Sequence, residues 1–203
     1  MIHYHGGPLG KASEAHEFFS GRHSLVSFQH REELEIIAEV SSSFIFDNGA
    51  FSVWKCGGTL DVEGYYKWVD AWKKHPGFDW ALIPDIIEGS EEANDVLLSE
   101  WPHHTYGVPV WHLNESIERL KRLAQEWSCV ALGSTSGMTP GSSRFWSRMA
   151  IVMEGVCDTE GKPMCKLHGL RMLDPDIFKY VPFSSSDSAN AALNSFMYGR
   201  NFG

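Results

Sequence analysis

The fold is decided by the stretch Phe44-Ile45-Phe46-Asp47-Asn48-Gly49-Ala50-Phe51-Ser52. Three apolar residues run directly into a carboxylate, and a short apolar run bounded by a turn signal is typical of a buried strand. Asp47 then lies at the carboxyl end of that strand, where parallel α/β sheets and barrels gather their catalytic groups. The simpler interpretation is an Asx-type turn in which Asp47 binds its own backbone.

Similar short apolar stretches recur along the chain, and most are followed by a segment with helical spacing of its apolar residues. The predicted strands are 2–5, 24–28, 44–46, 80–83, 108–111, 129–132, 164–167 and 181–184, and the predicted helices are 31–40, 61–74, 90–101, 115–127, 142–156, 174–179 and 187–196. Strands that alternate with helices indicate a parallel sheet. Eight such repeats predict an α/β fold, a small (β/α)8 TIM-like barrel that forms one domain over residues 1–203. An open doubly wound sheet would show a G-x-G-x-x-G motif after its first strand, which this sequence lacks.

The composition is that of an ordinary soluble globular protein, with 43% apolar and 21% charged residues in 203. The sequence has no apolar run of the roughly 20 residues that a membrane helix needs, and its first residues lack the features of a signal peptide. No two cysteines form a C-x-x-C pair, so neither a disulfide framework nor a zinc ribbon is predicted. These features predict a cytoplasmic protein without a membrane partner. The four cysteines are Cys56, Cys129, Cys157 and Cys165.

The net charge of −9 argues against a general nucleic-acid coat, which would carry a basic excess. An enzyme that meets nucleic acid through one local basic face is still compatible with this charge. The alternative is that the basic residues of the last third are solvated surface charges. These residues are Arg144, Arg148, Lys162, Lys166, Arg171, Lys179 and Arg200.

Polar residues follow most of the predicted strands, so a barrel would bring them to one rim. They are Asp47, Asp85, His112, Gly133, Ser134, His168 and Asp187. Three carboxylates and two histidines gathered on one rim indicate a functional site, because clustered like charges cost free energy. Two chemistries need such a set, namely substitution at a sugar carbon by paired carboxylates and metal-assisted hydrolysis.

The metal alternative rests on His3-Tyr4-His5, which has the H-x-H spacing of metal-binding barrels. His3 and His5 lie inside the predicted strand, however, and no Lys or further His falls where such sites need one. The sequence therefore favours paired carboxylates, with no metal and no cofactor.

The segment Phe46-Asp47-Asn48-Gly49-Ala50-Phe51 resembles the D-S-G-G-F motif of queuine and archaeosine tRNA-guanine transglycosylases, and more closely that of the DNA 7-deazaguanine transglycosylases of bacteria and phages. Further segments follow in family order over nearly the whole chain, although only the first and last of these matches are specific. The later segments are Ile83-Pro84-Asp85, Val110-Trp111-His112-Leu113, Ala131-Leu132-Gly133-Ser134 and Pro182-Phe183-Ser184-Ser185-Ser186-Asp187-Ser188. This resemblance implies an enzyme that exchanges guanine in DNA for a 7-deazaguanine base.

The resemblance also implies roles for the strand-end residues. Asp187 would attack the C1′ carbon of a flipped-out guanine nucleotide and form a covalent glycosyl-enzyme, and Asp47 would be the general acid/base. Phe51 would stack on the base and Asp85 would accept hydrogen bonds from it. His112 would read the 7-substituent or would be a hydrogen-bonded core histidine. The residues expected to bind the base are Phe51, Asn48, Asp85, His112, Gly133, Ser134 and His168.

Two features of the tRNA enzymes are missing, the C-x-C-x-x-C zinc site and the P-T-R segment that follows their nucleophile. Both absences favour DNA over tRNA as the partner, with the 7-deazaguanine free base as second substrate and accessory proteins left open. The alternatives are the same exchange on RNA, as in tRNA-guanine transglycosylases, and a non-catalytic nucleoside-binding barrel.

Overall fold

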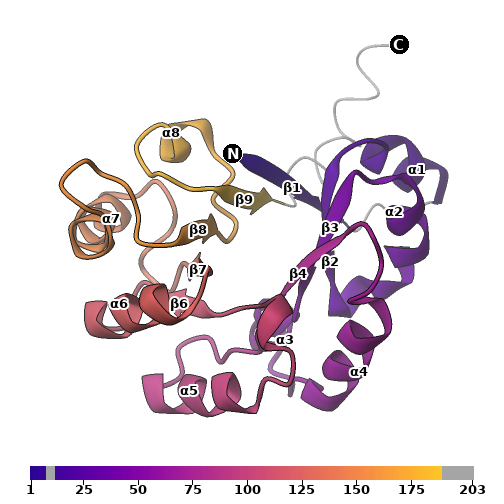
Figure 1. Ribbon diagram of the computed structural model, residues 1–203, viewed down its shortest axis with the longest axis horizontal. Coiled ribbons are helices and arrows are strands. Elements are labelled where there is room, and N and C mark those ends of the chain that lie inside the picture. The colour runs from indigo at the N-terminus through magenta and orange to yellow at the C-terminus, as the bar shows by residue number, and fades with distance from the viewer. Residues whose placement is uncertain (8–11, 189–203) are drawn as a thin grey trace. The chain divides into compact units, whose positions relative to one another are not determined.

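The computed structural model describes residues 1–7 and 12–188, and its strands and helices alternate along the chain (Figure 1). The chain divides into two compact units. Of the described residues, the amino-terminal unit comprises 2–7, 12–82, 102–107 and 187–188, and the carboxy-terminal unit comprises 83–101 and 108–186 together with Met1. Within each unit, every strand pair whose register is described is parallel.

The amino-terminal unit holds strands in the hydrogen-bonded order β5-β4-β3-β2-β1. Its elements are β1 (Ile2–Gly6), α1 (Ala12–Phe19), β2 (His23–Ser27), the 3-10 segment η1 (Phe28–Glu33), α2 (Leu34–Val40), β3 (Ser43–Asp47), α3 (Ala50–Cys56), α4 (Val62–Trp72), β4 (Phe78–Leu82), the 3-10 segment η2 (His104–Tyr106) and the first residue of β5 (Gly107–Val108).

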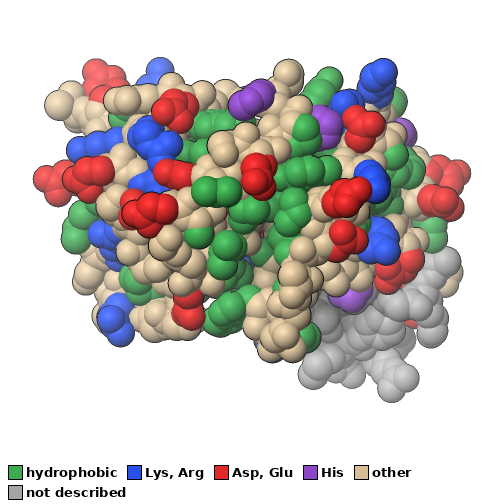
Figure 2. All heavy atoms as spheres, turned by 90° about the horizontal axis from the view of Figure 1, so that it is seen from below, with side chains coloured by type: hydrophobic (Ala, Val, Ile, Leu, Met, Phe, Trp, Pro, Cys, Tyr) green, Lys and Arg blue, Asp and Glu red, His purple; other side chains and the backbone are tan. Residues whose placement is uncertain are grey.

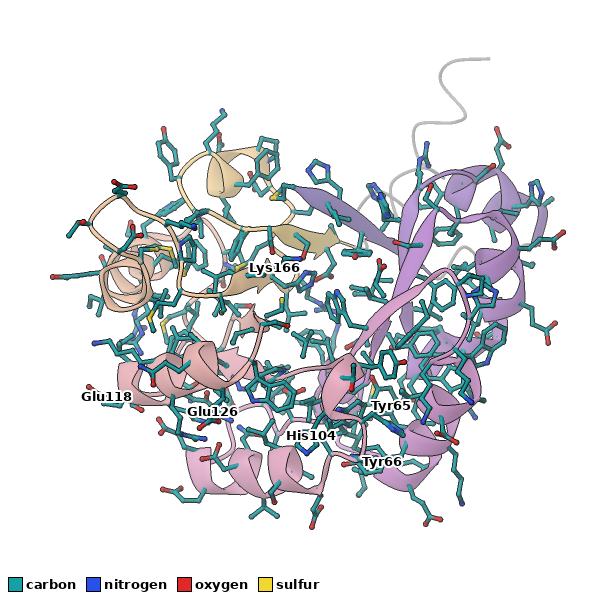
Figure 3. The ribbon with its side chains drawn as sticks, in the orientation of Figure 1. Tyr65, Tyr66, His104, Glu118, Glu126 and Lys166 are labelled. Atoms are coloured by element: carbon teal, nitrogen blue, oxygen red, sulfur yellow. The ribbon has the colours of Figure 1, made fainter. Side chains whose placement is uncertain are left out.

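Aromatic side chains join β3 to α4 in this unit. The ring of Phe46 stacks on Trp68 with 3.8 Å between centroids, and Phe44 meets Trp72 edge-on. Tyr65, labelled on α4 in Figure 3, donates a hydrogen bond of 2.8 Å to the carbonyl oxygen of Leu82. The stripe of aromatic residues on α4 that the sequence predicts therefore faces the sheet.

The carboxy-terminal unit holds strands in the order β9-β8-β7-β6. Its elements are α5 (Glu91–Glu100), β6 (Val110–His112), α6 (Ile117–Glu126), β7 (Cys129–Gly133), α7 (Ser143–Val156), β8 (Lys166–Gly169), α8 (Pro175–Phe178) and the first half of β9 (Ser185–Ser188). One apolar core joins its strands to α6 and α7. That core includes Trp111, Leu120, Leu123, Val130, Leu132, Phe145, Met149, Val152 and Leu167.

The division between the units falls within two strands, β9 and the stretch 107–112. Pro109 interrupts the stretch 107–112. Its first part, β5, pairs with β4, and its second part, β6, pairs with β7. The Ile83 N–H donates to the Val108 carbonyl and the Ala131 N–H donates to the Pro109 carbonyl, each at 2.9 Å. With 107–112 counted as one strand, the described part of the chain holds eight strands in chain order with helices between them. The predicted α/β fold of the (β/α)8 barrel class is confirmed.

Most predicted helices are found within a residue or two of their expected ends, including α5 behind its Ser90 cap and α7 behind Ser142. The helix predicted over 115–127 starts two residues later than expected. α6 begins at Ile117, because the Ser116 hydroxyl accepts a hydrogen bond from the Arg119 N–H at 3.1 Å. Helices α1 and α3 were not predicted, since the first is followed directly by β2 and the second is only seven residues long.

The last strand lies later in the chain than the sequence predicts. Pro182 has no N–H to offer to a ladder, and pairing with β8 begins only when the Ser184 N–H donates to the Leu167 carbonyl. β9 therefore covers Ser185–Ser188, and Asp187 lies in this buried strand instead of starting a helix. The predicted helix over 189–196 falls outside the described residues.

Candidate functional site

Two of the strand-end residues predicted from the sequence meet in the carboxy-terminal unit. Asp85 follows the Ile83-Pro84 segment after β4, and His112 is the last residue of β6. The Asp85 Oδ2 atom lies 3.0 Å from the His112 Nε2 atom, and both side chains are at most one-tenth exposed. Gly133 is the register partner of His112, and a Cβ atom at Gly133 would lie 3.1 Å from the imidazole ring. The imidazole is therefore fixed between a carboxylate and the β7 backbone.

Glu115 holds the other side of this imidazole. Its Oε1 atom lies 3.5 Å from His112 Nδ1, and its Oε2 atom accepts a hydrogen bond from the His112 backbone N–H at 3.1 Å. Oε2 also accepts from the Arg119 guanidinium at 2.6 Å. Arg119 in turn pairs with Asp95 of α5 at 3.0 Å, and all three of His112, Glu115 and Arg119 are buried. Asp85, His112, Glu115, Arg119 and Asp95 thus form one chain of alternating charge.

Asn94 connects this chain to the segment that carries Asp85. Its Oδ1 atom accepts from the Ile86 N–H at 2.7 Å, and its Nδ2 atom donates to the Ile86 carbonyl and to Glu115 Oε1 at 3.3 and 3.0 Å. One buried amide on α5 therefore fixes the backbone next to Asp85 and the carboxylate behind His112. The residues that support Asp85 come from two helices and one strand.

The pKa values in this cluster follow from burial and charge together. Burial alone would lower the pKa of His112, but the hydrogen bonds and charges of Asp85 and Glu115 outweigh it and raise the pKa to about 9. Burial would raise the pKa of Glu115, but the His112 hydrogen bond and the Arg119 charge lower it overall. At neutral pH His112 is therefore an imidazolium between two carboxylates.

A groove of about 760 Å³ reaches Glu115 from the side of the loop between β6 and α6. Arg148 of α7 shapes this groove, because its guanidinium donates to the carbonyl oxygens of Leu113 and Glu115 and lies 5.4 Å from the Trp111 ring centroid. The groove is lined by Glu91, Leu113, Asn114, Glu115, Ser116, Ile117, Glu118, Met138 and Arg148.

The Asp47 segment forms a turn from β3 into α3 in the amino-terminal unit. Asn48 is buried, and its Oδ1 atom accepts a hydrogen bond from the Ala50 N–H at 2.8 Å. Gly49 has a φ of +82° and is the residue before the helix. Asn48 therefore closes an Asx turn at this point. Phe51 lies on the first turn of α3 with its ring 5.8 Å from that of Trp54.

Gly49→Ala is expected to destabilise the amino-terminal unit by about 1–2 kcal/mol. A side chain is strained at this positive φ, and its Cβ atom would also lie 2.9 Å from the Gln29 Cγ atom. Urea unfolding of the wild type and the variant measures the loss. Gly21→Ala is a control for φ alone, because Gly21 has a φ of +67° with nothing within 4 Å of its Cβ position. A loss at Gly49 no larger than at Gly21 would show that the close approach to Gln29 is unimportant.

The other predicted residues lie on or next to β3, β7, β8 and β9. His168 is fully buried, and its Nδ1 atom shares a hydrogen bond of 2.8 Å with Ser185 Oγ across β8 and β9. Ser134 follows β7 and is partly buried. Asp187 is buried in β9, and β1 and β2 separate that strand from β3, which ends at Asp47. The roles assigned to these residues from the sequence stay predictions.

Two members of the proposed basic face are held by other groups of the protein. Arg148 is engaged by backbone carbonyl groups, and Lys179 lies 3.3 Å from Asp176. Figure 2 shows acidic and basic side chains intermixed on the face in view. On α6, where Figure 3 labels Glu118 and Glu126, Arg122 pairs with Asp95 and Glu126. Among residues 1–7 and 12–188, no three His, Cys, Asp or Glu side chains gather as a metal site requires.

Comparison with known proteins points elsewhere than the transglycosylases. No family model and no curated protein matches the sequence. Solved structures of the tryptophan synthase alpha-subunit from Pyrococcus furiosus do match. A single-residue variant of that protein is 13% identical in sequence, with a TM-score of 0.58, and the match covers 98% of this chain and 91% of that chain. A second structure of the alpha-subunit is also 13% identical, with a TM-score of 0.57, and the match covers 99% of this chain and 91% of that chain. The likeness is one of fold.

The resemblance to DNA 7-deazaguanine transglycosylases is therefore wrong, and with it the predicted base exchange and the assignment as a pentosyltransferase. The physical reason lies in the Asp47 segment. An apolar strand, an Asx residue, a glycine at positive φ and a helix start are the parts of a common strand-to-helix turn. They recur in α/β proteins whatever the chemistry, so the motif carried less information than the resemblance assumed.

The expected partners change accordingly. DNA and a free 7-deazaguanine base were predicted as partners from that resemblance alone, and no other observation supports them. None of the helices described in residues 1–7 and 12–188 is long and apolar enough to cross a membrane.

Proposed function

We propose that this protein is an enzyme that uses Asp85 as a general acid–base group on a small polar substrate, with His112 as its positioning partner. The observation that carries the proposal is the fixed Asp85–His112–Glu115 arrangement at the carboxyl ends of β4 and β6. In (β/α)8 barrels this end of the strands is where catalytic residues lie. A carboxylate ordered by a histidine, which is itself ordered by a second carboxylate, is a recurrent acid–base arrangement.

The charges of the cluster define what Asp85 can do. His112 and Arg119 are cationic, and Asp85, Glu115 and Asp95 are anionic, so the positive charges lie between the negative ones. The Asp85 side chain is the group that would exchange a proton or a hydrogen bond with a substrate, and His112 lies 3.0 Å from it. His112 has both ring nitrogens directed at carboxylates, so its role is to orient Asp85 and to stabilise its charge.

The test compares turnover by the wild type and the Asp85→Asn variant. Each protein is incubated in D2O with a small-molecule extract from bacteria, and mass spectrometry follows metabolites that are consumed, formed or deuterated. We expect changes that slow by about 10²- to 10⁴-fold in the variant, the usual contribution of acid–base catalysis. Asp176→Asn, a matched change at a side chain that is 83% exposed, is expected to retain the rate.

Two results would contradict the proposal. Turnover that is equal in the wild type and Asp85→Asn would place the reacting group elsewhere. An extract left unchanged by the wild type would favour a binding protein instead.

A second candidate function follows from the likeness over almost the whole chain to tryptophan synthase alpha-subunits. In this case the protein would act in tryptophan synthesis together with a partner subunit. Expression in a bacterium that lacks its own alpha-subunit would then restore growth without tryptophan, and Asp85→Asn would abolish this growth. If growth is not restored, the second candidate function is excluded, and Asp85 would act on another substrate.

A reducing cytoplasmic location is part of the same proposal. All four cysteines are free thiols, and burial raises the pKa of Cys129 to about 12 and of Cys165 to about 11. Thiols of such high pKa are poor nucleophiles at neutral pH and are suited to a reduced state.

A further inference from the structure

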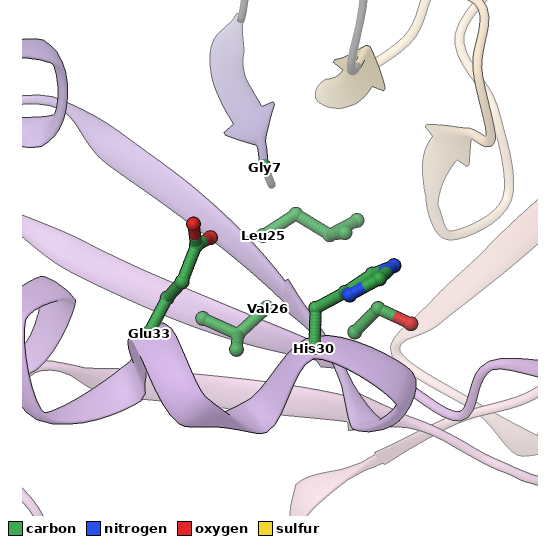
Figure 4. A pocket seen from close by; sticks show the side chains of 6 residues that line it. Gly7, Leu25, Val26, His30 and Glu33 are labelled. Atoms are coloured by element: carbon green, nitrogen blue, oxygen red, sulfur yellow. The ribbon is translucent and has the colours of Figure 1, made fainter. Parts of the chain in front are cut away.

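A small polar cavity lies in the amino-terminal unit, and its lining shares no residue with the Asp85 cluster. It has a volume of about 20 Å³ and is found at the carboxyl ends of β1 and β2. Figure 4 shows Glu33 and His30 projecting from η1 beside Val26, with Gly7 at the end of β1 above them. The lining residues are Gly7, Leu25, Val26, Ser27, His30 and Glu33.

Ser27 is the residue whose hydroxyl needs an explanation. Its Oγ atom is inaccessible to solvent and has no hydrogen-bond partner among residues 1–7 and 12–188. Buried hydroxyl groups without a partner are rare in native proteins, and they usually mark a bound water or ion. Ser27 is the register partner of Asp47, so the cavity lies one strand away from the predicted general acid/base.

Glu33 supplies a carboxylate to the same cavity. Its Oε2 atom lies so close to Gly7 that a Cβ atom at that position would be 2.2 Å from it. The absence of a side chain at Gly7 therefore allows the carboxylate to take this position. His30 adds an imidazole whose Nδ1 atom lies 3.6 Å from Glu32.

The volume limits the guest to one non-hydrogen atom. A cavity needs roughly 10–15 Å³ to admit a water molecule, and that molecule needs two to four polar partners. The cavity satisfies the first condition, and Ser27, His30 and Glu33 satisfy the second. A phosphate, a carboxylate or any larger ligand would not fit.

We propose that this cavity binds a single small hydrogen-bonding guest, water or ammonium, which pairs with the Ser27 hydroxyl and the Glu33 carboxylate. Both guests have the same size and can donate to a carboxylate. Water can also accept a hydrogen bond from the Ser27 hydroxyl, whereas ammonium would donate a hydrogen bond to the Ser27 oxygen. The site is distinct from the Asp85 cluster and does not depend on the proposed function.

Ser27→Val tests the site, because the added methyl groups fill the cavity and remove the hydroxyl. A high-resolution crystal structure of the wild type should show one peak within hydrogen-bond distance of Ser27 Oγ, and the variant should lack it. In solution, oxygen-17 relaxation dispersion should count one fewer long-lived water in Ser27→Val. The control is Ser128→Val, at an exposed serine just before β7.

Gly7→Ala provides a second variant that leaves Ser27 in place. Its Cβ atom displaces the Glu33 carboxylate, so the guest should be lost or become exchangeable. To test whether the guest is ammonium, thermal unfolding is measured in ammonium chloride and in sodium chloride at equal ionic strength. A melting temperature that rises only with ammonium assigns the guest as ammonium, and equal values with a long-lived water assign it as water.

An empty cavity in the wild-type crystal structure would overturn the proposal. Equal counts of long-lived waters in the wild type and Ser27→Val, together with no response to ammonium, would overturn it as well.

Discussion

Glu115→Ala is expected to lower the free energy of unfolding by about 3–5 kcal/mol. The carboxylate lies between two buried cations. Its removal leaves the Arg119 guanidinium without its nearest counter-charge and the His112 imidazolium with Asp85 as its remaining carboxylate partner. It also removes the acceptor of the Asn94 amide and of the His112 backbone N–H. Urea unfolding followed by circular dichroism measures the loss.

The control for this prediction is Glu118→Ala. Glu118 lies in the first turn of α6, three residues after Glu115, but it is exposed, so its removal should change stability by less than about 0.5 kcal/mol. A Glu115→Ala protein that loses no more than the Glu118 variant would show that the charge chain contributes little to folding.

The second large effect is a loss of stability at alkaline pH. The folded pKa of His112 is raised from 6.5 to about 9, so the stabilisation is fully present below pH 6.5 and disappears as the pH rises through about 9. At about 1.4 kcal/mol for each pKa unit, this rise corresponds to about 3 kcal/mol. The free energy of unfolding, measured by urea titration at several pH values from 6 to 10, should fall accordingly.

His112→Gln separates this effect from the titration of other groups. Glutamine retains hydrogen-bonding capacity but no titrating ring, so the variant should be less stable than the wild type at pH 6 and should lose little further stability up to pH 10. If the free energy of unfolding falls with pH by the same amount in both proteins, His112 is not charged in the native state.

Much of the fold could be predicted from the sequence, because periodicity is a local signal. The aromatic stripe of α4 and the serine cap before α5 are examples in which neighbouring residues determine the element. β9 was misplaced for the opposite reason. Its residues Ser185–Ser188 are polar yet buried, and their partner is the distant strand β8, so their burial has no local signature.

The site could be predicted only in part. Asp85 and His112 were identified because each follows an apolar strand, and parallel strands bring such residues to one edge. Glu115 and Arg119 were missed as functional residues, although their i,i+4 spacing is visible in the sequence. This spacing is typical of exposed helical ion pairs, and the burial that makes the pair important depends on α5 and β6 packing around it.

The resemblance to transglycosylases failed where a backbone requirement was interpreted as chemistry. Asn48 and Gly49 are explained by the geometry of the turn into α3. Asp85 and His112 are not explained in this way, because their contact joins two separate strand ends and buries charge.

The most direct test of the proposed site is a proton titration of His112 by nitrogen-15 NMR on the folded protein. We predict that both ring nitrogens are protonated at pH 7.5, that the ring titrates near pH 9, and that Asp85→Asn lowers this pKa. An imidazole that titrates near 6.5 and is unaffected by Asp85→Asn would contradict the charged Asp85–His112–Glu115 arrangement on which the proposed function rests.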